Sequence, residues 1–181
     1  AGTLYERSDP GALADLLSDM QHNDPAVLSG LEIIFYGNHR TASYITMILK
    51  KYPGLRSCIA YGGFKSPEEI QTQLIQADAL LFLEQDHPYD GVLTGKIFEY
   101  MHARKPVLCV GVGEHSYVGK FLGRSGVCFL CGNDMNRVRD FIMKLRFGTV
   151  AITPDEDYIG RFSRKAGSQK LESFMRSCLC K

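Results

Sequence analysis

The sequence predicts an α/β fold of the Rossmann-like kind, a doubly wound parallel sheet with helices on both of its faces. Short apolar runs recur along the 181 residues, and amphipathic segments with apolar residues at helical spacing separate them. Strands that are apolar throughout are typical of parallel sheets covered on both faces. Strands that alternate with helices are typical of repeated βαβ units.

Local signals place the individual elements. Ser8 or Asp9 is the expected N-cap of the first helix, with Pro10 in its first turn. Ser66 and Glu69 form a capping-box pattern before a later helix. The expected helices cover residues 10–21, 42–51, 67–76, 94–104, 116–122, 134–147 and 161–179, and the expected strands cover residues 1–5, 31–36, 57–61, 79–83, 106–110 and 126–130.

Charge and hydropathy give no indication of a nucleic-acid partner, a membrane span or an export signal. The chain has 21 Lys plus Arg and 20 Asp plus Glu, so its net charge of +1 gives no electrostatic reason to expect nucleic acid as a partner. No apolar run reaches the ~20 residues that a membrane span needs. No charged segment followed by an apolar one opens the chain as an export signal would. The expected location is therefore the cytoplasm.

Six cysteines raise the question of a metal site. Cys128 and Cys131 have C-x-x-C spacing. Residues three apart on a strand point to opposite faces, however, and no second Cys or His pair follows at ligand spacing. Neither a metal site nor a catalytic triad or Cys-His pair is predicted, and no residue is assigned a catalytic role.

The clearest functional signal lies where a helix begins at Thr94, Gly95 and Lys96. Uncapped amide groups and the helix dipole both favour an anion there, such as a phosphate or diphosphate. Glu99 lies one turn further along the same face as Lys96 and can accept two hydrogen bonds from a sugar diol. The alternative is an amphipathic helix on which Lys96 and Glu99 are only solvated.

This region resembles the donor site of GT-B glycosyltransferases, above all the retaining enzymes similar to family 4. It reads G-V-L-T-G-K-I-F-E-Y over residues 91–100 and K-P-V-L over residues 105–108, and G-T-L-Y at residues 2–5 is similar to the start of their second domain. The resemblance implies one half of a GT-B fold. Residues 1–152 would form the nucleotide-sugar-binding domain. Residues 153–181 would form a helical tail that packs back on this domain or toward an N-terminal acceptor domain. The sequence starts within a predicted strand, which indicates that this acceptor domain is left out.

The resemblance also implies roles for individual residues. Arg7 and Lys96 would contact the diphosphate of the donor, and Glu99 its ribose. Many of these enzymes carry two acids eight residues apart, the first near the transferred sugar and the second on the ribose. Glu99 matches the second acid, but the position of the first is Gly91 in this chain, with Asp90 beside it. The residues expected to lie against the base or to open the helix are Tyr61, Gly62, Gly63, Phe64, Leu93, Thr94 and Gly95.

The activity implied for the full-length protein is transfer of a sugar from a UDP- or GDP-sugar to an acceptor hydroxyl, a hexosyltransferase reaction of glycan or polysaccharide synthesis. No cofactor is expected besides the sugar nucleotide. The fragment alone is expected to be inactive. Through the missing acceptor domain, the full-length enzyme could associate peripherally with the inner face of the membrane.

Several alternatives remain open at this level. A sugar-nucleotide epimerase or hydrolase could use the same scaffold. A non-catalytic interaction module could too, and Gly91 in place of the first acid favours it. The G-x-G-x-x-S run at residues 111–116, with Asp134 beyond it, partly matches a dinucleotide fingerprint. Phe64 could either offer a flat face to a base or be tucked into the core.

Overall fold

The structure, a computed structural model, describes residues 2, 4, 8–84 and 93–179, and its centre is a parallel sheet in two parts. One part has two strands and the other has three, in the order β3-β4-β5, and every pairing is parallel. The strands are β1 (Ile33–Tyr36), β2 (Ile59–Gly63), β3 (Leu80–Leu83), β4 (Val107–Val110) and β5 (Cys128–Gly132).

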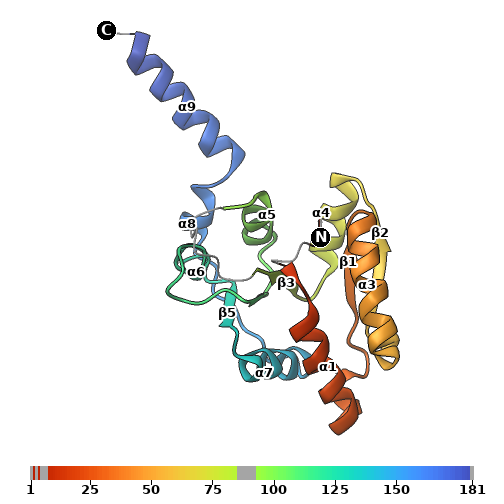
Figure 1. The fold of residues 1–181 in the computed structure, drawn as a ribbon. Helices are drawn as coiled ribbons and strands as arrows, with labels where there is room; N and C mark the ends of the chain where they lie inside the picture. Colours follow the sequence, from red (N-terminus) through yellow and green to blue (C-terminus); the bar gives the residue numbers. More distant parts are fainter. Residues whose placement is uncertain (1, 3, 5–7, 85–92, 180–181) are drawn as a thin grey trace.

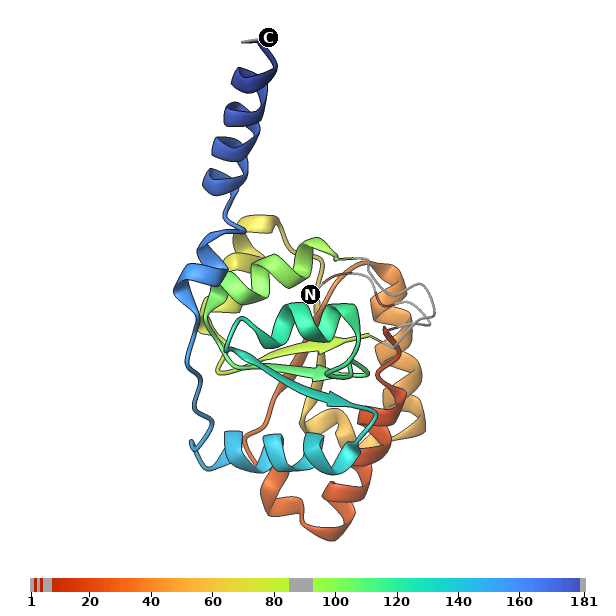
Figure 2. The ribbon, with the colours of Figure 1, turned by 90° about the vertical axis from the view of Figure 1, so that its left-hand side faces the viewer.

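Helices cover both faces of this sheet, as Figures 1 and 2 show. Buried residues of α1, α3 and α7 form one core cluster, and those of α4, α5, α6 and α8 form the other. The helices are α1 (Gly11–Asn23), α2 (Pro25–Leu28), α3 (His39–Lys51), α4 (Pro67–Gln76), α5 (Gly95–Ala103), α6 (Tyr117–Gly123), α7 (Met135–Arg146), α8 (Glu156–Gly160) and α9 (Arg164–Leu179), with a short 3-10 helix, η2 (Pro53–Ser57).

Strand β4 shows why its sequence is apolar throughout. Val107 and Cys109 belong to one core cluster, while Leu108 and Val110 belong to the other. Successive side chains on a strand point to opposite faces, so a central parallel strand must be apolar at every position. The predicted fold class, a Rossmann-like doubly wound sheet, is confirmed.

The starts of α1 and α3 differ from the prediction, and α9 begins at Arg164 rather than at residue 161. Pro10, and not Ser8 or Asp9, is the N-cap residue of α1, and the Asp9 carboxylate accepts from the Gly11 N–H at 2.9 Å in a local turn before the helix. Helix α3 starts earlier than the expected residue 42, because the Asn38 side chain caps it. The capping box of Ser66 with Glu69 before α4 is confirmed.

The C-terminal tail forms two helices where the sequence predicted one. Helix α8 packs on the domain through Tyr158 and Ile159, which are buried in the same cluster as α5 and α6. Helix α9 projects away from the sheet (Figure 1), and Leu171, Phe174 and Met175 on it are exposed. Packing of this helix against another domain stays a prediction. None of the described helices is long and apolar enough to cross a bilayer.

We expect Gly62→Ala to destabilise the fold by about 1–3 kcal/mol, because a Cβ there would collide with the ring of Tyr36. That ring has little freedom to move, since the Tyr36 hydroxyl donates to the Gln73 Oε1 at 2.7 Å. Gly160→Ala is the matched control, because a Cβ there would meet no described residue beyond its own helix within 4 Å. Urea unfolding should show little loss for the control. Equal losses in both variants would contradict this packing.

Candidate functional site

The carboxyl ends of β1 and β2 are joined by hydrogen bonds through Gly37. The Gly37 N–H donates to the Gly63 carbonyl at 3.0 Å, and the Tyr61 hydroxyl donates to the Gly37 carbonyl at 2.8 Å. A Cβ on Gly37 would collide with Gly2 and Thr41, so glycine is required for this close approach. Ligands of doubly wound sheets bind outside the carboxyl ends of strands, which makes this edge the candidate site.

Gly2 lies at the same edge and connects β1 to α5. Its N–H donates to the Tyr36 carbonyl at 2.8 Å, and its carbonyl accepts from the Thr41 hydroxyl at 3.0 Å. A Cβ on Gly2 would lie 3.1 Å from Cε and 3.3 Å from Nζ of Lys96. The Lys96 side chain therefore extends from α5 across the edge of the sheet to the end of β1.

Helix α5 is held firmly enough to position Lys96. Ile97, Tyr100 and Met101 are buried against the sheet. At the other end of the helix, Arg104 adopts a left-handed conformation with φ of 50°, and its guanidinium binds the Glu156 carboxylate. Lys96 is thus on a rigid element rather than on a loop.

Two carboxylates influence Lys96. Partial burial lowers the pKa of Lys96, while the negative charges of Glu84 and Glu99 raise it. Glu99 lies on α5, as the sequence predicted, and its effect on Lys96 agrees with the expected common face. Glu84 follows directly after β3, and its N–H donates to the Val110 carbonyl at 3.0 Å. The site combines one partly buried cation with two acids.

The N-terminus of α5 lacks a side-chain cap. Thr94 is the N-cap residue, but its hydroxyl makes no capping hydrogen bond, and its buried Oγ1 has no partner among the described residues. By contrast, the N-cap side chains of α3, α4, α6, α7 and α8 all accept backbone N–H groups. The first turn of α5 also carries no acidic residue. These features suit an anion at the helix start, beside Lys96.

The residues expected against a base lie on the other side of Gly2, at the end of β2. Phe64 is 79% exposed, so its ring is not tucked into the core and that alternative is wrong. Tyr61 is 39% exposed, and its hydroxyl is held by Gly37. Gly62 packs on Tyr36, and Gly63 has a φ of 84°. Glycine is therefore favoured at position 62 by the lack of space for a Cβ and at position 63 by the backbone conformation.

Three residues of the predicted site are not among those that the structure describes. Arg7, Asp90 and Gly91 lie outside the described residues. Leu93 packs against the core cluster that contains α5 and α6. The described residues at the candidate site are Tyr61, Gly62, Gly63, Phe64, Thr94, Gly95, Lys96 and Glu99, together with Gly2, Gly37 and Glu84.

Glu84, Gly2 and Gly37 received no role from the sequence alone. Glu84 carried a usable signal, because a carboxylate directly after an apolar strand falls at the edge where ligands bind. Gly37 also follows an apolar strand and shares that signal. The close contact between Gly2 and Gly37 could not be predicted, since it depends on how close the backbone approaches a residue distant in sequence.

The polar residues of the dinucleotide alternative serve as helix caps. The Ser116 hydroxyl accepts from the Gly119 N–H at 2.9 Å and caps α6. The Asp134 carboxylate accepts from the Asn136 N–H at 2.9 Å and caps α7. Both side chains therefore already have a local structural role.

The cysteines of the C-x-x-C pair belong to different cores. Cys131 is buried in the cluster with α7, and Cys128 packs against the cluster with α6. The prediction that they point to opposite faces of the strand is confirmed. Within residues 2, 4, 8–84 and 93–179, no group of His, Cys, Asp and Glu is arranged to hold a metal ion.

We expect the pKa of Lys96 to lie below the ordinary value of a lysine side chain, because burial disfavours its charged form. Glu84→Gln or Glu99→Gln should lower the pKa of Lys96 further, since each removes a negative charge that supports the ammonium. Side-chain NMR titration of Lys96 in the three chains measures this. An ordinary lysine pKa for Lys96 would contradict its described burial.

Fold and site together define a Rossmann-like domain with an open, cation-bearing site at the carboxyl edge of its sheet. No protein-family model matches the sequence, and no curated protein matches it. Two solved structures are similar to this chain in fold. The crystal structure of HepE (Alr3699) from Anabaena in complex with UDP superposes with a TM-score of 0.61 over 97% of this chain and 48% of that one, at 15% identity.

The crystal structure of TarM superposes with a TM-score of 0.56 over 95% of this chain and 34% of that one, at 14% identity. The chain thus spans about half of HepE and about a third of TarM. At such low identity the likeness shows the fold alone, and it agrees with the Rossmann-like α/β fold predicted from the sequence.

Proposed function

We propose that this chain is the donor-binding half of a GT-B glycosyltransferase and that it binds the nucleoside diphosphate of a sugar nucleotide at the start of α5. The observation that carries the proposal is the uncapped α5 N-terminus with Lys96 beside it, at the carboxyl edge of the sheet. The UDP complex of the HepE structure supports a nucleotide ligand for this fold.

Each part of the site has a proposed partner on the ligand. The Gly95 and Lys96 N–H groups and the Lys96 ammonium bind the diphosphate, and Glu99 accepts hydrogen bonds from the ribose hydroxyls. Phe64, or the exposed part of the Tyr61 ring, offers a flat face to the base. Arg7 is proposed as a second cation for the diphosphate. Asp90, in place of an acid at Gly91, is proposed near the sugar.

In the proposed reaction, an acceptor hydroxyl attacks the anomeric carbon of the sugar and the nucleoside diphosphate leaves. Negative charge grows on the leaving group, so fixed N–H donors and a cation aimed at it lower the barrier. Lys96 suits this task because it is positioned by a helix that is anchored in the core. The acceptor would be bound by another domain of a longer protein, so this chain alone is expected to transfer nothing.

Calorimetric titration of the chain with UDP, GDP, uridine and NAD tests the proposal. We expect saturable binding of one nucleoside diphosphate and at least about tenfold weaker binding of its nucleoside, because the diphosphate supplies the charge that the site complements. Binding of NAD alone would favour a dehydrogenase. Binding of none of the four by the folded chain would favour an interaction module.

A further inference from the structure

Glu84 extends strand β3 by one residue at the carboxyl edge of the sheet. Its N–H donates to the Val110 carbonyl of β4 at 3.0 Å, just as the Leu80 N–H donates to the Pro106 carbonyl at 2.8 Å where β3 begins. The backbone is therefore still paired with β4 at Glu84, and the residue is partly buried. The proposed function assigns the Glu84 carboxylate to no group of the ligand.

The alternation of side chains along β3 directs Glu84 toward helix α5. Leu80 and Phe82 are buried in the core cluster that contains α5, whereas Leu81 packs against the other cluster. Successive side chains on a strand point to opposite faces, so Glu84 points to the same face as Leu80 and Phe82. The Phe82 ring packs edge-on against Tyr100 of α5, with 6.3 Å between the ring centroids. The face of β3 that carries Glu84 is thus the face that α5 covers.

The same geometry brings Glu84 level with Lys96. Strands β3 and β4 are parallel, so α5, which connects them, runs in the opposite direction. Glu84 lies about 6.6 Å beyond Phe82 along the strand. Lys96 lies about 6 Å before Tyr100 along the helix and on the same side of it. Burial lowers the pKa of Lys96, and of the two carboxylates that oppose this effect Glu84 acts more strongly than Glu99.

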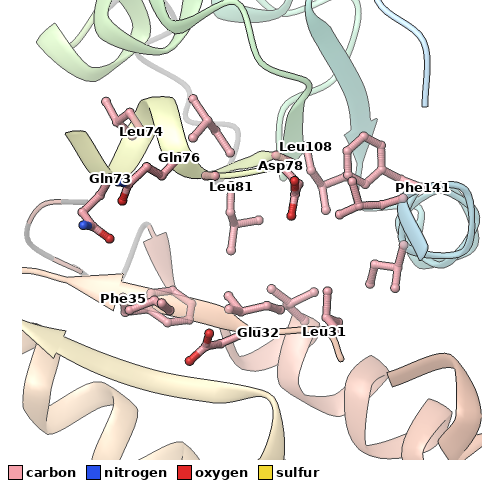
Figure 3. Close-up of a pocket in the computed structure, with 18 of the residues that line it drawn as sticks. Leu31, Glu32, Phe35, Gln73, Leu74, Gln76, Asp78, Leu81, Leu108 and Phe141 are labelled. Carbon is pink, nitrogen blue, oxygen red and sulfur yellow. The ribbon is translucent and has the colours of Figure 1, made fainter. Parts of the chain in front are cut away.

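The ends of the strands place Glu84 on the far side of Lys96 from the proposed base site. Strand β1 pairs with β2, and β3 faces β1 across a cavity of about 620 Å³, with Leu81 and Phe35 on its two sides (Figure 3). Along the carboxyl edge, Phe64 follows β2, the Lys96 side chain reaches the end of β1, and Glu84 follows β3. A ligand with its base at Phe64 and its diphosphate at Lys96 is therefore directed toward Glu84.

We propose that Glu84 binds the sugar of the sugar nucleotide by accepting hydrogen bonds from its hydroxyl groups. This inference rests on the proposed function, because it requires the diphosphate to lie at the start of α5. In a sugar nucleotide the base and the sugar lie on opposite sides of the diphosphate, as Phe64 and Glu84 lie on opposite sides of Lys96. A carboxylate offers acceptors only, so it binds sugar hydroxyls and repels an anionic group. Glu84 therefore favours a neutral sugar at this place.

Calorimetric titration with UDP, UDP-glucose, UDP-galactose, GDP and GDP-mannose tests this inference on the chain as it is and on the Glu84→Ala, Glu84→Gln and Glu99→Gln variants. The quantity compared is a ratio, the Kd of the sugar nucleotide that binds most tightly divided by the Kd of its nucleoside diphosphate. We expect Glu84→Ala to raise this ratio at least about tenfold, and Glu84→Gln to raise it as well, because a charged acceptor that only the sugar uses is removed. Glu99→Gln is the matched control, since both ligands contain the ribose that Glu99 binds, and it should leave the ratio unchanged.

An unchanged ratio in a folded Glu84→Ala chain would overturn the inference, and circular dichroism shows whether each variant is folded. An equal loss of affinity for both ligands would also overturn it, because Glu84 would then act only by holding Lys96 in place. A ratio raised by Asp90→Ala but not by Glu84→Ala would assign the sugar to Asp90 instead. Binding of a nucleoside diphosphate without any of its sugar nucleotides would likewise contradict the assignment. Binding of none of these nucleotides by the folded chain is a distinct result, because it overturns the proposed function itself.

Discussion

Ile97→Ala should reduce the free energy of unfolding by about 2–5 kcal/mol, a large share of the stability of a typical domain. Ile97 is 0% exposed and lies in the cluster that joins α5 to β3, β4 and α6. Removing its side chain leaves a cavity that the surrounding residues cannot fill without moving α5. Urea unfolding followed by circular dichroism measures the loss.

Ile75→Ala is the matched control for this variant. Ile75 also lies on a helix, α4, but is 65% exposed. Its truncation removes little buried surface, so the expected change is within about 0.5 kcal/mol. A loss for Ile97→Ala no larger than that of the control would mean that α5 is not anchored as described. Lys96 would then have no rigid support.

Lys96→Ala should weaken binding of the preferred nucleoside diphosphate at least about tenfold, because a hydrogen bond to a charged group contributes about 1.5–3 kcal/mol. The Lys96 side chain reaches the edge of the sheet beside the uncapped N-terminus of α5. Two carboxylates, Glu84 and Glu99, act on it electrostatically, so its removal also leaves the site net negative. Calorimetry with UDP and GDP measures the effect.

Lys165→Ala controls for the loss of one positive charge. Lys165 is exposed on α9, which projects away from the sheet. Its removal changes the net charge by the same amount and should leave affinity unchanged. Equal weakening in both variants would indicate a general charge effect. Unchanged affinity in Lys96→Ala would remove Lys96 from the proposed site.

Much of the fold could be predicted because its signals are local. The apolar run at residues 79–83 and the capping box of Ser66 with Glu69 each depend on neighbours within a few residues. The start of α3 was missed because Asn38 caps it from a position that reads equally well as a loop. The short helix α8 was missed because Tyr158 and Ile159 turn inward only once the core exists to receive them.

The candidate site was predictable only in part. Thr94, Gly95, Lys96 and Glu99 fall within one stretch of sequence, and helical spacing alone places them together. The contact of Lys96 with Gly2 is different, because it joins residues far apart in sequence and depends on the position of β1. Such contacts follow from the assembled sheet and leave no pattern in the chain.

The most direct test of the central claim is a residue-resolved NMR titration of this chain with UDP and with GDP. We expect saturable amide shifts with one of them at Gly95 and Lys96 and at the end of β2, near Phe64, and no saturable shift at residues 111–116. The absence of any saturable shift, or shifts confined to residues 111–116 and Asp134, would contradict a diphosphate site at the start of α5.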